Sequence, residues 1–178
     1  HVLKEKYPPE LKHDAVRLLQ RVLGDFGPAP GRVPAFESYA SPLPLDRWER
    51  ELDPLRTQLA NANLNDDDQV LNEELGRLLA MLEPYNPKLL DAVLAGITEE
   101  SPAVGDIHRL LMAARIPVQR NAPQRQTIAK SLVPLEVKFA EQKLPQDSNW
   151  NDRIKELYAR LAELDQYLAA TIVKEPAF

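Results

Sequence analysis

The chain has 178 residues, of which 44% are hydrophobic and 28% charged, and these fractions are typical of a folded domain, not of a disordered chain. It carries 22 basic and 27 acidic side chains, so its net charge is −5, and this acidic balance argues against general nucleic-acid binding. The absence of cysteine excludes disulfides and cysteine nucleophiles, and no apolar run approaches the roughly 18 residues of a membrane-spanning helix, so we expect no direct membrane insertion.

The first predicted helix spans residues 10–23. Gly24 follows it at the position where a left-handed residue commonly ends a helix. The apolar side chains of this helix recur at steps of three and four, which places them on one helical face: Leu11, Ala15, Leu18, Leu19 and Val22.

Residues 24–45 are predicted to form one long loop, because the three glycines and five prolines between Gly24 and Pro44 prevent a regular helix. We expect this loop to wrap over the surface, to be dispensable for folding, and to offer Phe36 and Tyr39 as binding residues. Prolines reduce the entropy that a segment loses on docking, and the two rings provide apolar area for a partner. The alternative is that both rings fold back onto the helices and cover the core.

Two helices are predicted between Asp46 and Pro84. The first directs Trp48 toward the core, and Pro54 either kinks it or begins a new short helix. The second carries a stripe of leucines: Leu71, Leu75, Leu78, Leu79 and Leu82.

The segment between these two helices is rich in Asn and Asp. Its alternating side-chain oxygens are similar to the ligands of a calcium loop, but an EF-hand needs Gly at the sixth position and Glu at the twelfth, where this chain has Asp66 and Asn72. We therefore expect the acidic residues at 66–68 to stabilise the positive end of the following helix.

Caps and prolines also mark the next two helices. Asn86 and Pro87 are a cap followed by a first-turn proline, and they predict a short helix that Gly96 ends. A longer helix is predicted between Ser101 and Pro117.

Two more helices are predicted in the last third of the chain. One opens at Asn121, and Pro134 in its middle is expected to kink it. The other begins after residues 147–149 and is expected to bend near Asp165. We expect Trp150 to anchor this last helix as a hydrophobic staple at its start.

The pattern as a whole predicts an all-α fold. No window alternates apolar and polar residues between turn signals, so no strand is predicted. We expect about seven or eight helices, arranged as HEAT-like helical pairs or as an irregular helical bundle, within a single domain at residues 1–178. Because His1 stands in place of an initiator Met, we also expect this domain to be excised from a larger protein.

Few features of the sequence point to catalysis. The histidines are His1, His13 and His108, and none has another histidine three or four positions away, so no helical metal pair exists. Nucleophile-elbow, dinucleotide-binding and phosphate-loop motifs are also absent. We therefore assign no catalytic residue, metal site or cofactor. The competing interpretation is a small hydrolase that uses an acidic residue and His108 in a pocket.

Basic residues gather in the middle of the chain. Arg115, Arg120 and Arg125 straddle a turn there, and we assign them as candidate binding residues for a partner or an anion. The alternative is a solvated helix face with acidic neighbours. Binding of single-stranded nucleic acid is disfavoured because the net charge is negative.

Six short segments of the chain form a pattern found in a known group of proteins: residues 14–20, 23–25, 106–111, 114–117, 149–154 and 156–157. Through these motifs, residues 10–25 and 70–178 resemble a helical segment of very large exported bacterial proteins. Those proteins join a sorbosone-dehydrogenase-like propeller, HEAT-like helical repeats and a c-type haem domain in one polypeptide.

This resemblance implies a non-catalytic helical module that is exported, or periplasmic, together with its parent protein. It carries over no catalytic residue and no haem-binding motif. We therefore expect a helical scaffold or protein-interaction module whose partner is another protein or the flanking domains of the same chain.

Overall fold

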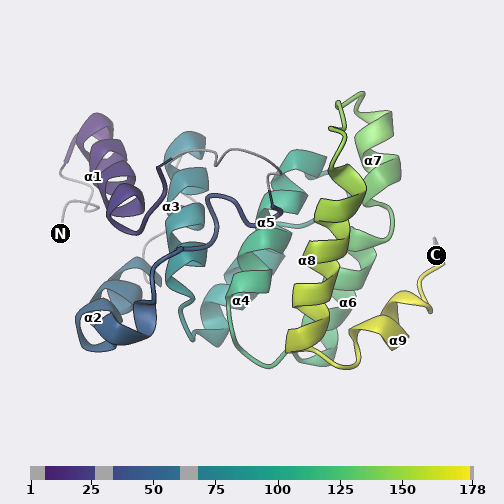
Figure 1. Ribbon diagram of the computed structural model, residues 1–178. Helices are drawn as coiled ribbons and strands as arrows, with labels where there is room; N and C mark the ends of the chain where they lie inside the picture. Colours follow the sequence, from purple (N-terminus) through teal and green to yellow (C-terminus); the bar gives the residue numbers. More distant parts are fainter. Residues whose placement is uncertain (1–6, 27–33, 61–67, 177–178) are drawn as a thin grey trace.

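All regular structure in the computed structural model of this chain, which describes residues 7–26, 34–60 and 68–176, is helical (Figure 1). This confirms the predicted all-α class for the described residues. In chain order the elements are α1 (Pro9–Val22), the 3-10 helix η1 (Leu45–Trp48), α2 (Glu49–Ala60), α3 (Gln69–Leu82), α4 (Pro87–Ala95), α5 (Ala103–Arg115), α6 (Ala122–Leu132), α7 (Leu135–Glu141), α8 (Trp150–Leu164) and α9 (Leu168–Ile172).

Three of the predicted polar caps are confirmed, whereas η1, α5 and α8 begin without a side-chain cap. The side chains of Asp68 and Asn86 accept hydrogen bonds from backbone N–H groups in the first turns of α3 and α4. Asn121 and Gln124 form a reciprocal capping box at the start of α6. The calcium-like residues 61–67 lie outside the described part of the chain.

The end of α1 also agrees with the prediction. Gly24 has a φ of +97°, a left-handed conformation that side chains rarely adopt. A Cβ atom at this position would lie 2.6 Å from Cγ of Pro42, so the close approach of the following loop also requires glycine.

Prolines and Asp165 set the number of helices. Pro54 lies inside α2, which continues through it. Pro134 separates α6 from α7, since proline lacks the N–H that would continue the ladder. Asp165 is extended, with φ −149° and ψ 99°, and it separates α8 from α9. The bend expected at Asp165 and the kink expected at Pro134 are therefore breaks.

Trp48 does not face the core, and the prediction for this residue was wrong. Its side chain is 57% exposed. Trp48 lies in the 3-10 helix η1, which has three residues per turn instead of 3.6. Its side chain therefore does not point to the same side as the apolar residues of α2, which follows. Trp150, in contrast, is half-buried, and its ring centroid lies 4.4 Å from that of Phe139 on α7.

The helices form a bundle with α5 at its centre. α5 packs against α3, α4, α7 and α8, and α3 in turn carries α1 and α2 on its other side. In Figure 1 α1 and α2 lie at one end of the molecule, and α6 to α9 lie toward the other. The core contains the predicted leucine stripe of α3, all five members of which are buried: Leu71, Leu75, Leu78, Leu79 and Leu82. No described helix has the length and apolar character needed to cross a bilayer.

Candidate functional site

Tyr39 and His108 meet in a polar network between the loop, α3 and α5. The Tyr39 hydroxyl lies 2.7 Å from Nδ1 of His108, and the Arg77 guanidinium carbon lies 5.9 Å from the centre of the Tyr39 ring. Burial, aided by the positive charge of Arg77, lowers the pKa of His108 to about 4. Burial also raises the pKa of Tyr39, although Arg77 opposes this shift. At neutral pH the tyrosine is therefore protonated and donates to a neutral imidazole.

His108 also lines a cavity of about 380 Å³ between α3, α4 and α5. Glu73 and Arg109 line the same cavity, and Glu73 is close enough to act on the charge of His108, so the chain does place an acidic residue near this histidine. A general base works best when its pKa lies near the working pH, and a pKa of about 4 makes His108 a weak base at neutral pH. None of the residues that line this cavity is a serine, threonine or cysteine, so it offers no hydroxyl or thiol nucleophile.

Phe36 and Tyr39, the candidate binding residues of the loop, lie against the helices. Tyr39 is buried and Phe36 is packed against the core, with the Arg115 guanidinium 5.9 Å from the Phe36 ring centre. The backbone N–H of Ala35 donates to Glu156 on α8 at 2.7 Å. This arrangement matches the alternative in which both rings fold back and cover the core.

The three candidate arginines each have partners within the chain. Arg115 lies 3.0 Å from a carboxylate oxygen of Glu83, and Arg125 lies 2.5 Å from one of Asp165. Arg120 is 3% exposed, and its guanidinium donates to the carbonyl of Ala113 in the last turn of α5 and to those of Ile116 and Val118 just after it. Burial lowers the pKa of Arg120 to about 10, which still leaves it charged at neutral pH.

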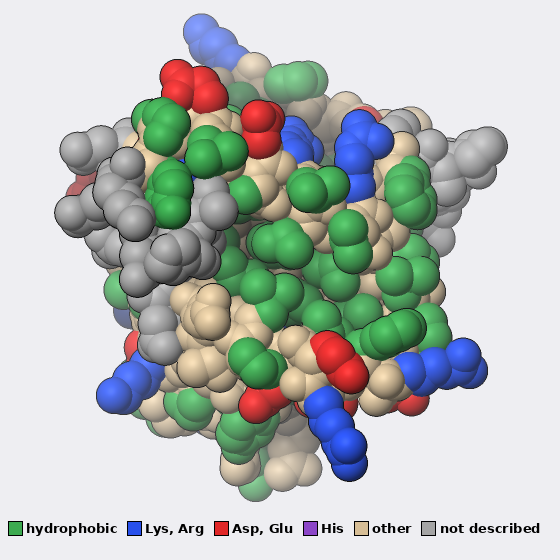
Figure 2. All heavy atoms as spheres, turned by 90° about the vertical axis from the view of Figure 1, so that its left-hand side faces the viewer, with side chains coloured by type: hydrophobic (Ala, Val, Ile, Leu, Met, Phe, Trp, Pro, Cys, Tyr) green, Lys and Arg blue, Asp and Glu red, His purple; other side chains and the backbone are tan. Residues whose placement is uncertain are grey.

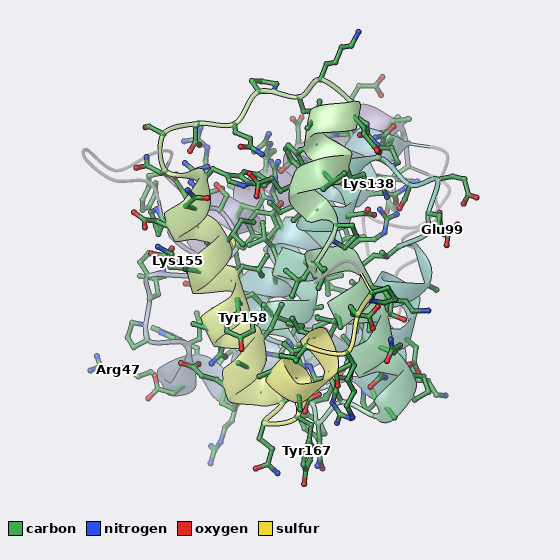
Figure 3. All side chains as sticks on the ribbon, turned by 90° about the vertical axis from the view of Figure 1, so that its right-hand side faces the viewer. Arg47, Glu99, Lys138, Lys155, Tyr158 and Tyr167 are labelled. Carbon is green, nitrogen blue, oxygen red and sulfur yellow. The ribbon has the colours of Figure 1, made fainter. Side chains whose placement is uncertain are left out.

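A second cavity of about 570 Å³ lies beside α6 and α7. One of its two lysines, Lys138, lies 2.6 Å from the buried carboxylate of Asp106. Figure 3 shows Lys138 on α7, with Glu99 on the same side of the molecule. Lys138 is paired with Asp106, and the other charged lining residues are of both signs, so this cavity does not present charge of one sign to a ligand. Among the described residues no cluster of three His, Cys, Asp or Glu side chains could hold a metal ion.

Exposed apolar side chains gather at the end formed by α1 and α2. Figure 2 shows hydrophobic side chains across the middle of this end and charged side chains around its rim. We call this surface the α1/α2 end face and define it by the exposed large hydrophobic residues of α1, of the segment that follows it and of η1: Leu11, Leu18, Val22, Phe26, Leu43 and Trp48.

The side of α1 that faces the bundle carries polar as well as apolar residues, among them Gln20 and Val16. Gln20 is fully buried, and its amide donates to the backbone carbonyl and to the carboxylate of Glu74 on α3, both at 2.9 Å. His13 bonds Asp68 at 2.7 Å beside them. Leu18 and Val22, on another side of α1, remain 64% and 63% exposed. The spacing of apolar residues in the sequence predicts the apolar face of α1, but it does not predict whether another helix covers that face.

Comparisons with known proteins give no relative for this chain. No protein-family model matches it, and neither the curated proteins nor the solved structures contain a match.

Proposed function

We propose that this chain is a non-catalytic helical scaffold or protein-interaction module, and that its docking surface is the α1/α2 end face. The observation that carries the proposal is the set of large apolar side chains exposed there, led by Phe26 at 78%. Contiguous apolar patches with a polar rim mark interaction sites in soluble proteins. An open end of a helical array also needs a polar cap or a further element to cover it.

The alternative, a hydrolase centred on His108, has less support. The imidazole is neutral and is held by Tyr39, and the cavity that it lines offers no hydroxyl or thiol nucleophile. The sequence resemblance adds a context to the scaffold proposal: a module between the domains of an exported protein, with those domains as its partners.

Site-specific photo-crosslinking tests the proposal. A benzophenone amino acid is placed at Leu18 or Trp48 on the end face, and at Val137 or Val173 as exposed apolar controls on α7 and after α9. The full chain is then irradiated in the cells that produce it. We expect discrete protein adducts from positions 18 and 48 only. Adducts of equal yield from the control positions, or none from the end face, would overturn the proposal.

A further inference from the structure

We infer that the partner of the α1/α2 end face is a second copy of this chain, bound through α1 in antiparallel orientation. The inference rests on the proposed function and names its partner. Three features of α1 support it: the spacing of its outward apolar residues, the order of the charges beside them, and the burial of its opposite flank against α3.

The outward apolar residues have the spacing of a helix-pairing seam. Leu11, Ala15, Leu18 and Val22, of which Ala15 is half-buried and the others are exposed, follow one another at steps of four, three and four, as the core positions of a coiled coil do. In an antiparallel pair, Leu11 would lie opposite Val22 of the second copy, and Ala15 opposite Leu18. Each of the two central contacts of the pair then joins a small side chain, Ala15, to a large one, Leu18, which lets the two helices approach closely.

The charges beside this seam favour a second copy in the antiparallel direction. Asp14 and Arg21 flank the seam on the same side and are both exposed. Within the described residues neither forms an ion pair. When two identical helices pair in antiparallel orientation, the same side of each helix borders the contact. Asp14 of each copy therefore lies opposite Arg21 of the other. The contact is self-complementary and closes about a two-fold axis.

The other flank of α1 cannot take part. It carries Lys12, which is buried, and Leu19, which packs against the core. A parallel pair would bring the Asp14 and Arg21 flank of one copy against this occupied flank of the other, so it would form no ion pair. The structure therefore favours the antiparallel arrangement over the parallel one.

The size of the seam sets the expected affinity. A helix of 14 residues is about 21 Å long and offers four seam layers. This contact is smaller than the roughly 1,600 Å² of a standard interface, so we expect a dimer that dissociates on dilution, with a Kd on the order of micromolar.

Sedimentation equilibrium of the full chain over a range of concentrations tests the inference. We expect a monomer–dimer equilibrium that Leu18→Glu abolishes and the control Val137→Glu leaves unchanged, because both residues are exposed. Asp14→Arg and Arg21→Asp should each weaken the dimer by about tenfold or more, and the double variant Asp14→Arg/Arg21→Asp should restore it. Circular dichroism confirms that each variant is folded.

The orientation is tested by disulfide trapping, which the absence of native cysteine makes unambiguous. A Leu11→Cys chain and a Val22→Cys chain are mixed and oxidised. We expect the mixed 11–22 disulfide to dominate, whereas the 11–11 and 22–22 products would indicate a parallel pair and overturn the inference. A chain that stays monomeric at all concentrations would also overturn it. If position 18 still crosslinks to a different protein, the proposed function stands without the second copy.

Discussion

Arg120 uses its charge to hold the chain that follows α5. Its guanidinium bonds the carbonyls of Ala113 and Ile116 at 2.5 and 3.1 Å. A cation near a helix C-terminus is favourable because the last carbonyls there lack intrahelical donors. The sequence places Arg120 just after the proline that ends this helix, and that position is the signal for a structural role.

Removal of the Arg120 side chain should therefore destabilise the folded chain. We expect Arg120→Ala to lower the free energy of unfolding by about 3 kcal/mol, since buried carbonyls lose a charged donor. The matched control is Arg47→Ala, because Arg47 is exposed and should contribute less than about 0.5 kcal/mol. Urea denaturation of both variants measures the difference. Equal midpoints for the two would mean that Arg120 is not a structural residue.

His108 should make stability depend on pH. Its pKa is about 4 in the folded chain and about 6.5 when unfolded, so between these values the unfolded state binds more protons. The free energy of unfolding should fall as the pH falls from about 6.5 to 4, by up to about 3 kcal/mol. Denaturation across this range, compared with the same series for His108→Asn, isolates the effect. Parallel pH profiles for the two chains would contradict it.

At the scale of elements, Gly24 joins α1 to the loop in a conformation that other residues resist. We expect Gly24→Ala to destabilise the chain by about 1–3 kcal/mol, because φ is positive and a Cβ would meet Pro42. Gly105→Ala is the control, since Gly105 lies inside α5 with an ordinary φ and faces only the flexible end of Arg109. That change should be neutral or stabilise by up to about 1 kcal/mol. The melting temperatures of the two variants measure the difference. Equal destabilisation by both substitutions would contradict the role assigned to Gly24.

The loop that follows should contribute to folding. Tyr39 is buried and bonds His108, and Ala35 bonds Glu156. Replacement of residues 34–42 by a Gly/Ser linker should therefore cost several kcal/mol, because it removes a buried aromatic side chain and leaves polar groups without partners. Chemical denaturation measures the loss. An unchanged midpoint would restore the first expectation, that the loop is dispensable and free to bind.

Local signals in the sequence were enough for most elements. Asp68, Asn86 and Asn121 cap their helices through backbone groups three residues away, so a short window contains all the information. The site residues depend on distant partners: Tyr39 on His108, and Arg125 on Asp165. Because such pairings are set by tertiary packing, composition and spacing could not predict that these side chains are already occupied.

At the scale of the whole molecule, the chain covers α5 on several sides and leaves one end open. α5 packs against four other helices, whereas α1 contacts chiefly α3 and leaves Leu11, Leu18 and Val22 exposed. This difference between a covered centre and an open end supports the proposed role in interaction.

The most direct test of this assignment is amide hydrogen exchange, read by mass spectrometry, of the chain in its dilute and its associated state. If the α1/α2 end face is the docking surface, peptides from α1 should exchange more slowly on association, while peptides from α6 and α7 should not change. Unchanged exchange in α1, together with new protection in α6 and α7, would contradict the account and move the interaction surface to the opposite side of the molecule.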